Sequence, residues 1–208
     1  MEGGAPDAVH GIQAADSRGW LSLTYDSPVF EQGLNNLVAW ILSGGSIARN
    51  FEPHFAVGRA EDADLLSDFF SEISNEYQIS DRPMKRADEA VPSENGAVLG
   101  RVLHILGVPT GEKAQQTLSL PSYLHQAPKP IIKKFAGVYI NNRGTKGRSQ
   151  NILKMREKRN DEYLDELIML FRSVLNSKSI TRSGKNIIFS NEAKSIVETQ
   201  LPYTKSDL

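Results

Sequence analysis

The chain has 208 residues and no cysteine, and its 24 basic and 25 acidic residues leave a formal net charge of −1. A hydrophobic content of 39% suits a folded protein, while the absence of cysteine excludes disulfides and thiolate metal sites. The four scattered histidines offer no paired metal ligands. No apolar run reaches the roughly 20 residues that cross a bilayer, and no signal-peptide pattern is present. We therefore expect a cytoplasmic protein that makes no membrane contact.

The charges are unevenly distributed along the chain. Residues 1–100 hold 16 acidic and 6 basic residues, whereas residues 129–159 hold 10 basic residues and one acidic residue, Glu157. A basic stretch of this kind can neutralise nucleic-acid phosphates, or it can be a solvated surface beside an acidic one. Composition alone leaves both interpretations open.

The first half begins with residues 1–25, whose weak periodicity predicts a frayed or loosely docked extension with little function. A helix-start signal at Asp26-Ser27-Pro28 and a glycine stop at Gly44-Gly45 bound the first long apolar pattern. In chain order, this half is predicted to contain a helix over 28–44, hairpin strands over 46–51 and 54–59, a helix over 61–73, a strand over 77–84, a polar loop over 85–94 and a helix over 96–106.

The second half is predicted to repeat this order. Its elements are a helix over 131–141, a strand over 150–156, a helix over 161–175, hairpin strands over 179–182 and 185–190, and a helix over 192–200. Two apolar sets share the spacing i, i+1, i+4, i+5, i+8: Leu65, Leu66, Phe69, Phe70 and Ile73, and Tyr163, Leu164, Leu167, Ile168 and Phe171. Two related αββα units, about 95 residues apart, are expected to pack as a pseudo-dimer.

Several segments resemble motifs of a known family. Residues 37–47 read LVAWILSGGSI, and residues 135–145 read FAGVYINNRGT, a weaker copy with an altered turn. Residues 99–109 and 120–129 are similar to the linker region of single-chain proteins of the same kind, including intein-type enzymes and WhiA-type sporulation regulators. Over about residues 28–200 the order and spacing of these motifs resemble the LAGLIDADG homing endonuclease superfamily.

The resemblance implies an α+β fold of two tandem αββαββα-like repeats, which form a pseudo-twofold saddle with antiparallel sheets. The expected parts are an N-terminal extension, a first repeat, a linker, a second repeat and a tail, over residues 1–25, 26–110, 111–128, 129–202 and 203–208. The other interpretation of the motif segments is that their small residues only mark two core helices that cross.

Family members cut DNA with one Asp at the end of each motif helix, because these carboxylates hold the divalent ions that hydrolyse the phosphodiester. The corresponding positions here are Gly44 and Asn142, or a residue next to Asn142, and residues 32–51 and 113–156 contain no Asp or Glu. We therefore expect cleavage by the family mechanism to be lost, with no resident cofactor and a role for Mg²⁺ only if residual nuclease activity exists.

In the family, outward strand positions lie in the DNA major groove, where side chains reach base edges. Strand alternation and neighbouring loops give these candidate contact residues: Arg49, His54, Arg82, Lys85, Arg86, Lys146, Arg148, Gln150, Lys154, Arg156, Arg182 and Lys185. Taken singly, a basic residue of this set is more often a solvated surface charge than a contact with nucleic acid. Ala56 and Gly58, on the same strand face as His54, have no side-chain hydrogen-bond donors. We therefore expect the second half to make most of the contacts with nucleic acid, through phosphates.

Three function classes follow. The leading hypothesis is a monomeric nucleic-acid-binding protein, with double-stranded DNA as first partner and structured RNA as second, since some relatives act as intron maturases and others as transcription regulators. The enzyme alternative is an endonuclease with unconventional metal ligands. The third is a protein-interaction module without a nucleic-acid partner, for which the acidic first half speaks. Binding to phosphates weakens steeply with salt, which separates the first class from the third.

Overall fold

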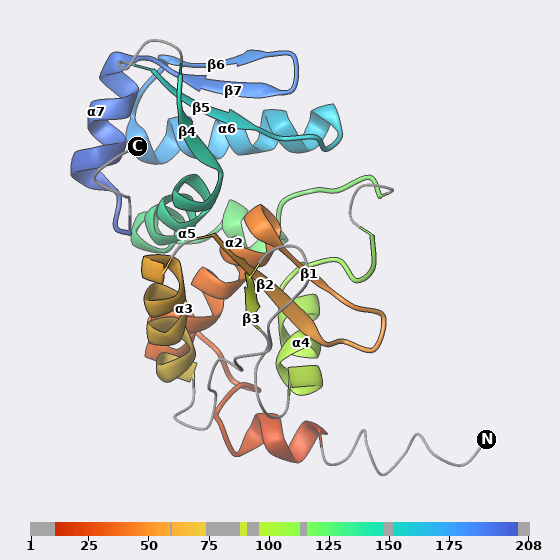
Figure 1. Ribbon diagram of the computed structural model, residues 1–208. Coiled ribbons are helices and arrows are strands. Elements are labelled where there is room, and N and C mark those ends of the chain that lie inside the picture. The colour runs from red at the N-terminus through yellow and green to blue at the C-terminus, as the bar shows by residue number, and fades with distance from the viewer. Residues whose placement is uncertain are drawn as a thin grey trace.

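The computed structural model describes residues 11–58, 60–73, 88–90, 96–112, 116–147 and 152–203, and it has an α+β fold with two small antiparallel sheets (Figure 1). Its labelled elements are η1 (Val29–Leu34), α2 (Asn35–Gly44), β1 (Gly45–Ile47), β2 (Pro53–Val57), α3 (Ala60–Ile73), β3 (Asp88–Ala90), α4 (Gly96–Ile105), η3 (Ser122–His125), α5 (Lys129–Arg143), β4 (Gly144–Lys146), β5 (Leu153–Arg156), α6 (Asp161–Leu175), β6 (Ile180–Ser183), β7 (Asn186–Phe189) and α7 (Asn191–Gln200). The α+β class predicted from the sequence is confirmed.

The first predicted helix is divided in two. Its opening part, η1, is a π-helix, and only its second part, α2, has α-helical hydrogen bonding. Gly33 of η1 lies so close to α3 that a Cβ there would stand 2.2 Å from Cγ2 of Ile73. The wider π turn therefore carries a glycine where two helices meet, a packing requirement that apolar periodicity does not reveal.

Two short strands were missed by the sequence analysis. β3 lies inside the predicted polar loop over 85–94, so that loop prediction was wrong for Asp88–Ala90, which pair with β2. β4 begins at the predicted helix break and pairs with β5. A three-residue strand is stabilised by pairing with its partner strand rather than by the preferences of its own residues. The predicted strand over 77–84 and residues 148–151 lie outside the described residues.

The two sheets have the orders β1-β2-β3 and β4-β5-β7-β6. In the first, Gly45 pairs with Phe55, and in the second, Gly144 pairs with Met155. Each strand pair therefore begins with a glycine that directly follows a helix and lies opposite a buried residue. The succession helix, strand, strand, helix, strand, helix runs from α2 to α4 and again from α5 to α7, with β6 added in the second passage.

Helices α2 and α5 form the centre of the molecule, and they lie between the two sheets in Figure 1. All residues from Asn35 to Ser43 and from Phe135 to Asn141 are buried. Gly137 of α5 faces the C-terminal segment, where a Cβ would stand 2.0 Å from the carbonyl oxygen of Pro202. Its small size therefore serves the contact with this segment rather than the crossing of the two helices.

The segment before η1 is docked on the core in its described part, because Ala15 and Trp20 are buried. The connection between the halves is also partly buried, at Leu118, Leu120 and Leu124. Of the helices in the described residues, none is long and apolar enough to cross a membrane.

Candidate nucleic-acid interface

The C-terminal ends of α2 and α5 meet through side chains. Nδ2 of Asn142 donates a hydrogen bond of 3.0 Å to Oγ of Ser43. That hydroxyl in turn donates to the carbonyl oxygens of Ala39 (2.8 Å) and Trp40 (3.0 Å), which anchors it to its own helix. Two uncharged side chains thus join the ends of the two motif segments.

Strand register relates the last residues of the two helices to one another. Since Gly45 and Gly144 take the same place in their strand pairs, Arg143 is the counterpart of Gly44, one residue from Asn142. None of these residues carries a carboxylate. Throughout the part of the chain that the structure describes, no group of three or more His, Asp or Glu side chains could hold a metal ion.

A buried polar network lies beside these helix ends. The hydroxyl of Tyr139 donates to Oε2 of Glu157 (2.7 Å) and lies 3.3 Å from the hydroxyl of Tyr163. Nε of Arg159 lies 3.4 Å from Oε1 of Glu157, and its guanidinium stands 4.7 Å from the ring centroid of Tyr163. Arg159 also donates to the carbonyl oxygen of Leu42 in α2, so a cation of the second half caps the helix of the first.

Burial raises the pKa of both phenols in this network, so they stay protonated well above neutral pH. Burial raises the pKa of Tyr139 well above its usual value, and burial is also the main cause that raises the pKa of Tyr163 to about 12. Protonated, buried and hydrogen-bonded groups of this kind hold a structure together. This network could not be predicted from the sequence, because Glu157 and Arg159 belong to a basic stretch whose composition indicates an exposed surface.

The open face of the second sheet carries two of the predicted contact residues, Lys154 and Arg156. They alternate along β5 with Leu153 and Met155, both fully buried, so they project from the opposite face. Arg156 is exposed and Lys154 is half-buried. Within the described residues neither forms a salt bridge, so two cations stand available on one side of one strand.

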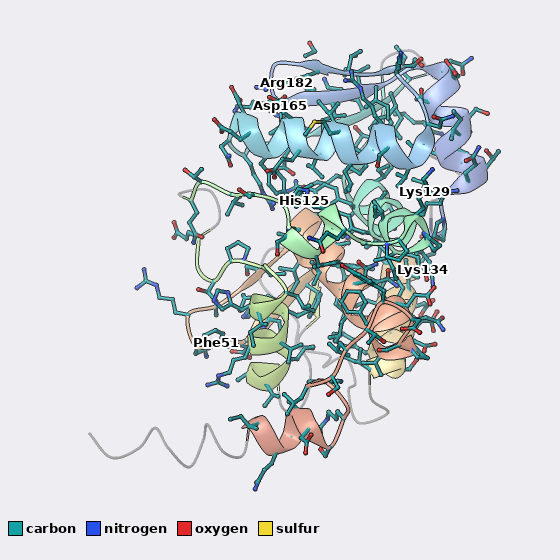
Figure 2. All side chains as sticks on the ribbon, turned by 180° about the vertical axis from the view of Figure 1, so that it is seen from behind. Phe51, His125, Lys129, Lys134, Asp165 and Arg182 are labelled. Carbon is teal, nitrogen blue, oxygen red and sulfur yellow. The ribbon has the colours of Figure 1, made fainter. Side chains whose placement is uncertain are left out.

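Arg182 and Lys185 lie on the helix side of this sheet instead. Arg182 pairs with Ile187, a core residue, and its guanidinium contacts Asp161 and Asp165 of α6, the latter at 3.1 Å; Figure 2 shows Arg182 beside Asp165. Nζ of Lys185 lies 2.6 Å from Oδ1 of Asp161. Both cations therefore neutralise α6 acids and face away from Lys154 and Arg156.

Lys146 is separated from Lys154 in a different way. Lys146 pairs with Leu153, whose side chain faces the core, so the side chain of Lys146 leaves β4 on the core side of the sheet. Because β4 is an edge strand, this side chain is still exposed to solvent. Three lysines of the basic stretch, at positions 129, 133 and 134, occupy the first turns of α5. A 15-residue helix is about 22 Å long, so these lysines lie far from β4. Lys134 is also paired with Glu31 at 2.8 Å.

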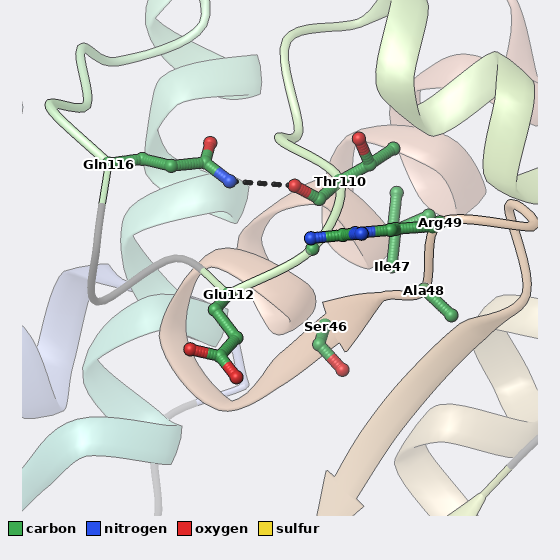
Figure 3. Close-up of a pocket in the computed structure, with 8 residues that line it drawn as sticks. Ser46, Ile47, Ala48, Arg49, Thr110, Glu112 and Gln116 are labelled. Carbon is green, nitrogen blue, oxygen red and sulfur yellow. Dashed lines mark hydrogen bonds between the residues drawn. The ribbon is translucent and has the colours of Figure 1, made fainter.

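In the first half, Arg49 and His54 flank the short strand β1. His54 pairs with Ser46 on the outward side of the sheet. Arg49 lines a polar pocket of about 910 Å³ between β1 and the segment after α4. Figure 3 shows Arg49 with Ser46, Glu112 and Gln116 around this pocket, where Gln116 donates to the carbonyl oxygen of Thr110 (2.7 Å).

The remaining predicted contact residues, Arg82, Lys85, Arg86, Arg148 and Gln150, lie outside the described residues. Among those described, the fold gathers only Lys154 and Arg156 on one open face. No family model matches this chain, and no curated protein matches it. Function is therefore inferred from the residues and their geometry.

Proposed function

We propose that this chain is a DNA-binding protein derived from a LAGLIDADG homing endonuclease that has lost its metal-binding acids. The observation that supports the proposal is the contact between Ser43 and Asn142, which joins the ends of the two motif segments through uncharged side chains, at Asn142 and directly beside Gly44, the two positions where the resemblance would place carboxylates. The repeated succession of elements supports two tandem repeats arranged as a pseudo-twofold saddle.

The binding surface in this proposal is the open face of the sheet β4-β5-β7-β6. Lys154 and Arg156 supply the positive charge, and the exposed hydroxyl of Thr181 supplies a neutral donor on the same face. Such side chains bind phosphates and base edges. The protein acts as a cytoplasmic monomer and serves as a regulator or maturase rather than as a nuclease.

The test is a binding titration of the full chain against mixed double-stranded DNA and structured RNA, at 50 mM and 200 mM salt, with Mg²⁺ present. We expect DNA binding that weakens at least tenfold at the higher salt, because cations that neutralise phosphates release counterions. The products are examined for nicks, and none are expected. Metal-dependent nicking would contradict the loss of catalysis, and no binding at low salt would favour a protein-interaction module.

The matched control is Lys129→Gln. Lys129 is an exposed lysine at the start of α5 and belongs to the same basic stretch (Figure 2). It lies at the end of the helix that is remote from β4, so its loss should leave DNA affinity within about twofold.

A further inference from the structure

The polar pocket beside β1 is bounded on one side by a tight turn that α4 holds in place. In this turn the backbone nitrogen of Phe51 donates to the carbonyl oxygen of Ala48 (2.9 Å), and Arg49 occupies the second position. The carbonyl oxygen of Phe51 lies so close to Gly100 of α4 that a Cβ there would stand 1.8 Å from it. The guanidinium of Arg101 stands 5.0 Å from the centroid of the Phe51 ring. The backbone that carries Arg49 is therefore fixed against a helix.

The opposite side of the pocket is the segment after α4, which is also fixed by backbone contacts. The nitrogen of Gly111, whose φ of 79° favours glycine, donates to the carbonyl oxygen of Ile47 (2.7 Å). Thr110 forms a parallel bridge with Ile47, and Gln116 donates to the carbonyl oxygen of Thr110 (2.7 Å). Both sides of the pocket are thus formed before a ligand binds, which lowers the entropy lost on binding.

Two opposite charges line this pocket without pairing with each other. They are Arg49 on the β1 side and Glu112 on the other side, and Figure 3 shows the guanidinium of Arg49 extending into the pocket. Within the described residues Arg49 forms no hydrogen bond and no salt bridge, so its N–H donors are available. A ligand in the space between them would need an anionic group near Arg49 and hydrogen-bond donors near Glu112.

The chemistry of the lining selects a phosphate that is attached to a sugar. The planar fork of a guanidinium matches two phosphate oxygens, and a third oxygen can accept from the hydroxyl of Ser46, which also lines the pocket. The carboxylate of Glu112 accepts hydrogen bonds, and sugar hydroxyls donate them. Among the described residues that line the pocket none is aromatic, so a nucleobase would find no ring to stack on.

We propose that this pocket binds a phosphorylated sugar, with the phosphate on Arg49 and Ser46 and the sugar hydroxyls on Glu112. The backbone of duplex DNA does not meet this requirement, because its sugars have no free hydroxyl groups. The inference therefore goes beyond the proposed DNA binding by the second sheet and does not depend on it. An α-amino acid carries two suitable charges, but its ammonium group would pair with an exposed carboxylate, and such pairs contribute little in water.

The experiment is isothermal titration calorimetry of the full chain with ribose 5-phosphate, inorganic phosphate, ribose and free glycine. We expect ribose 5-phosphate to bind about tenfold more tightly than inorganic phosphate, because only the sugar reaches Glu112. Ribose and glycine should give no measurable heat. Equal affinities for ribose 5-phosphate and inorganic phosphate would overturn the role of the hydroxyls, and tighter binding of glycine would overturn the choice of ligand.

Variants assign the contacts to their residues. Arg49→Gln should weaken the binding of ribose 5-phosphate and of inorganic phosphate about tenfold each, since both lose the charged donor. Glu112→Gln should weaken the binding of ribose 5-phosphate about threefold and should not weaken that of inorganic phosphate. The control Lys129→Gln removes a positive charge at the start of α5, outside the pocket, and should leave both affinities unchanged.

Wild-type affinity in Arg49→Gln, or an equal loss in Lys129→Gln, would overturn the proposal. Arg49 and Glu112 are both exposed, so the circular dichroism spectra of these variants should match the wild type. A loss of binding in Arg49→Gln with an unchanged spectrum therefore reports the lost contact rather than a lost fold.

Discussion

The first two strands of each sheet pair in the same register, but the two sheets present different side chains to solvent. With Phe55 and Met155 as equivalent core residues, the three outward positions of each strand pair can be compared directly: Ser46, His54 and Ala56 in the first sheet, and Thr145, Lys154 and Arg156 in the second. Two inward positions keep their apolar character, since Pro53 and Phe55 of the first sheet correspond to Leu153 and Met155 of the second, all of them buried in the core. The outward positions are released from that requirement, so chemistry can diverge there without a change of fold.

The two central helices differ in a similar way. In this register Trp40 of α2 and Tyr139 of α5 are equivalent, and each uses its polar atom on the following hairpin. Nε1 of Trp40 donates to the carbonyl oxygen of Ala56 (2.9 Å), whereas Tyr139 donates to the carboxylate of Glu157. The hydrogen bond of the buried aromatic side chain thus goes to a backbone carbonyl in the first half and to a member of a buried ion pair in the second half.

The largest expected effect is on stability, from Arg159→Met. The substitution leaves Glu157 buried without its cation and Leu42 without its donor, so we expect the free energy of unfolding to fall by about 3–5 kcal/mol. Urea unfolding measures the change. The control is Glu157→Gln/Arg159→Met, which removes both charges and should cost clearly less; an equal loss in the two variants would contradict the role of the ion pair.

The next effect is on DNA affinity, from Lys154→Gln/Arg156→Gln. Each contact is worth roughly 1.4 kcal/mol, so the double variant should bind double-stranded DNA about 100-fold more weakly at low salt. The slope of log affinity against log salt should shrink by about 2. Fluorescence anisotropy measures both. Lys129→Gln/Lys133→Gln removes the same charge at the remote end of α5, and an equal loss there would show that net charge alone drives binding.

A smaller effect concerns pH and the network at Tyr163. Folding raises the pKa of its phenol from 10.0 to about 12. Between these values the folded protein keeps a proton that the unfolded chain loses, so stability falls as pH rises through this window. From pH 8 to pH 11 the loss attributable to Tyr163 is about 1.4 kcal/mol. Unfolding of Tyr163→Phe at both pH values should show a correspondingly smaller fall; an identical fall would refute the assignment.

The smallest expected effect is a gain in the first sheet. His54→Lys/Ala56→Arg copies the outward residues of β5 onto β2, where Ala56 is exposed. If the two sheets face one DNA duplex, affinity should rise about fivefold at low salt, with a steeper salt dependence. The same anisotropy titration detects the change. No gain would mean that the first sheet faces away from the bound DNA.

Helix positions were the most predictable part of the fold. The bounds of α6 agree with the predicted range 161–175, and α3 and α7 differ from theirs by one residue at the first position. Amphipathic periodicity over three or four turns is a strong local signal. β3 and β4 were missed because their three-residue lengths depend on pairing with distant strands.

The candidate surface was predictable only in part. Alternation along β5 identified Lys154 and Arg156, because the buried side chains between them have a period of two. Arg182 and Lys185 were candidates because they flank the turn of the second hairpin, but α6 contributes the acids that pair with them, which this local position does not reveal. The burial of Arg159 could not be predicted either, since it follows from the contact of this residue with Leu42 in the other half.

The measurement that tests this account most directly is an NMR titration of the isotope-labelled chain with a DNA duplex that it binds in a salt-dependent way. At 23.0 kDa the chain is small enough for amide spectra. We predict that the largest chemical-shift changes fall on the open face of the second sheet, at Lys154, Arg156, Thr181 and Ile188, and that Lys129 is unaffected. Changes centred on the first sheet or on the start of α5, with none along β5, would contradict it.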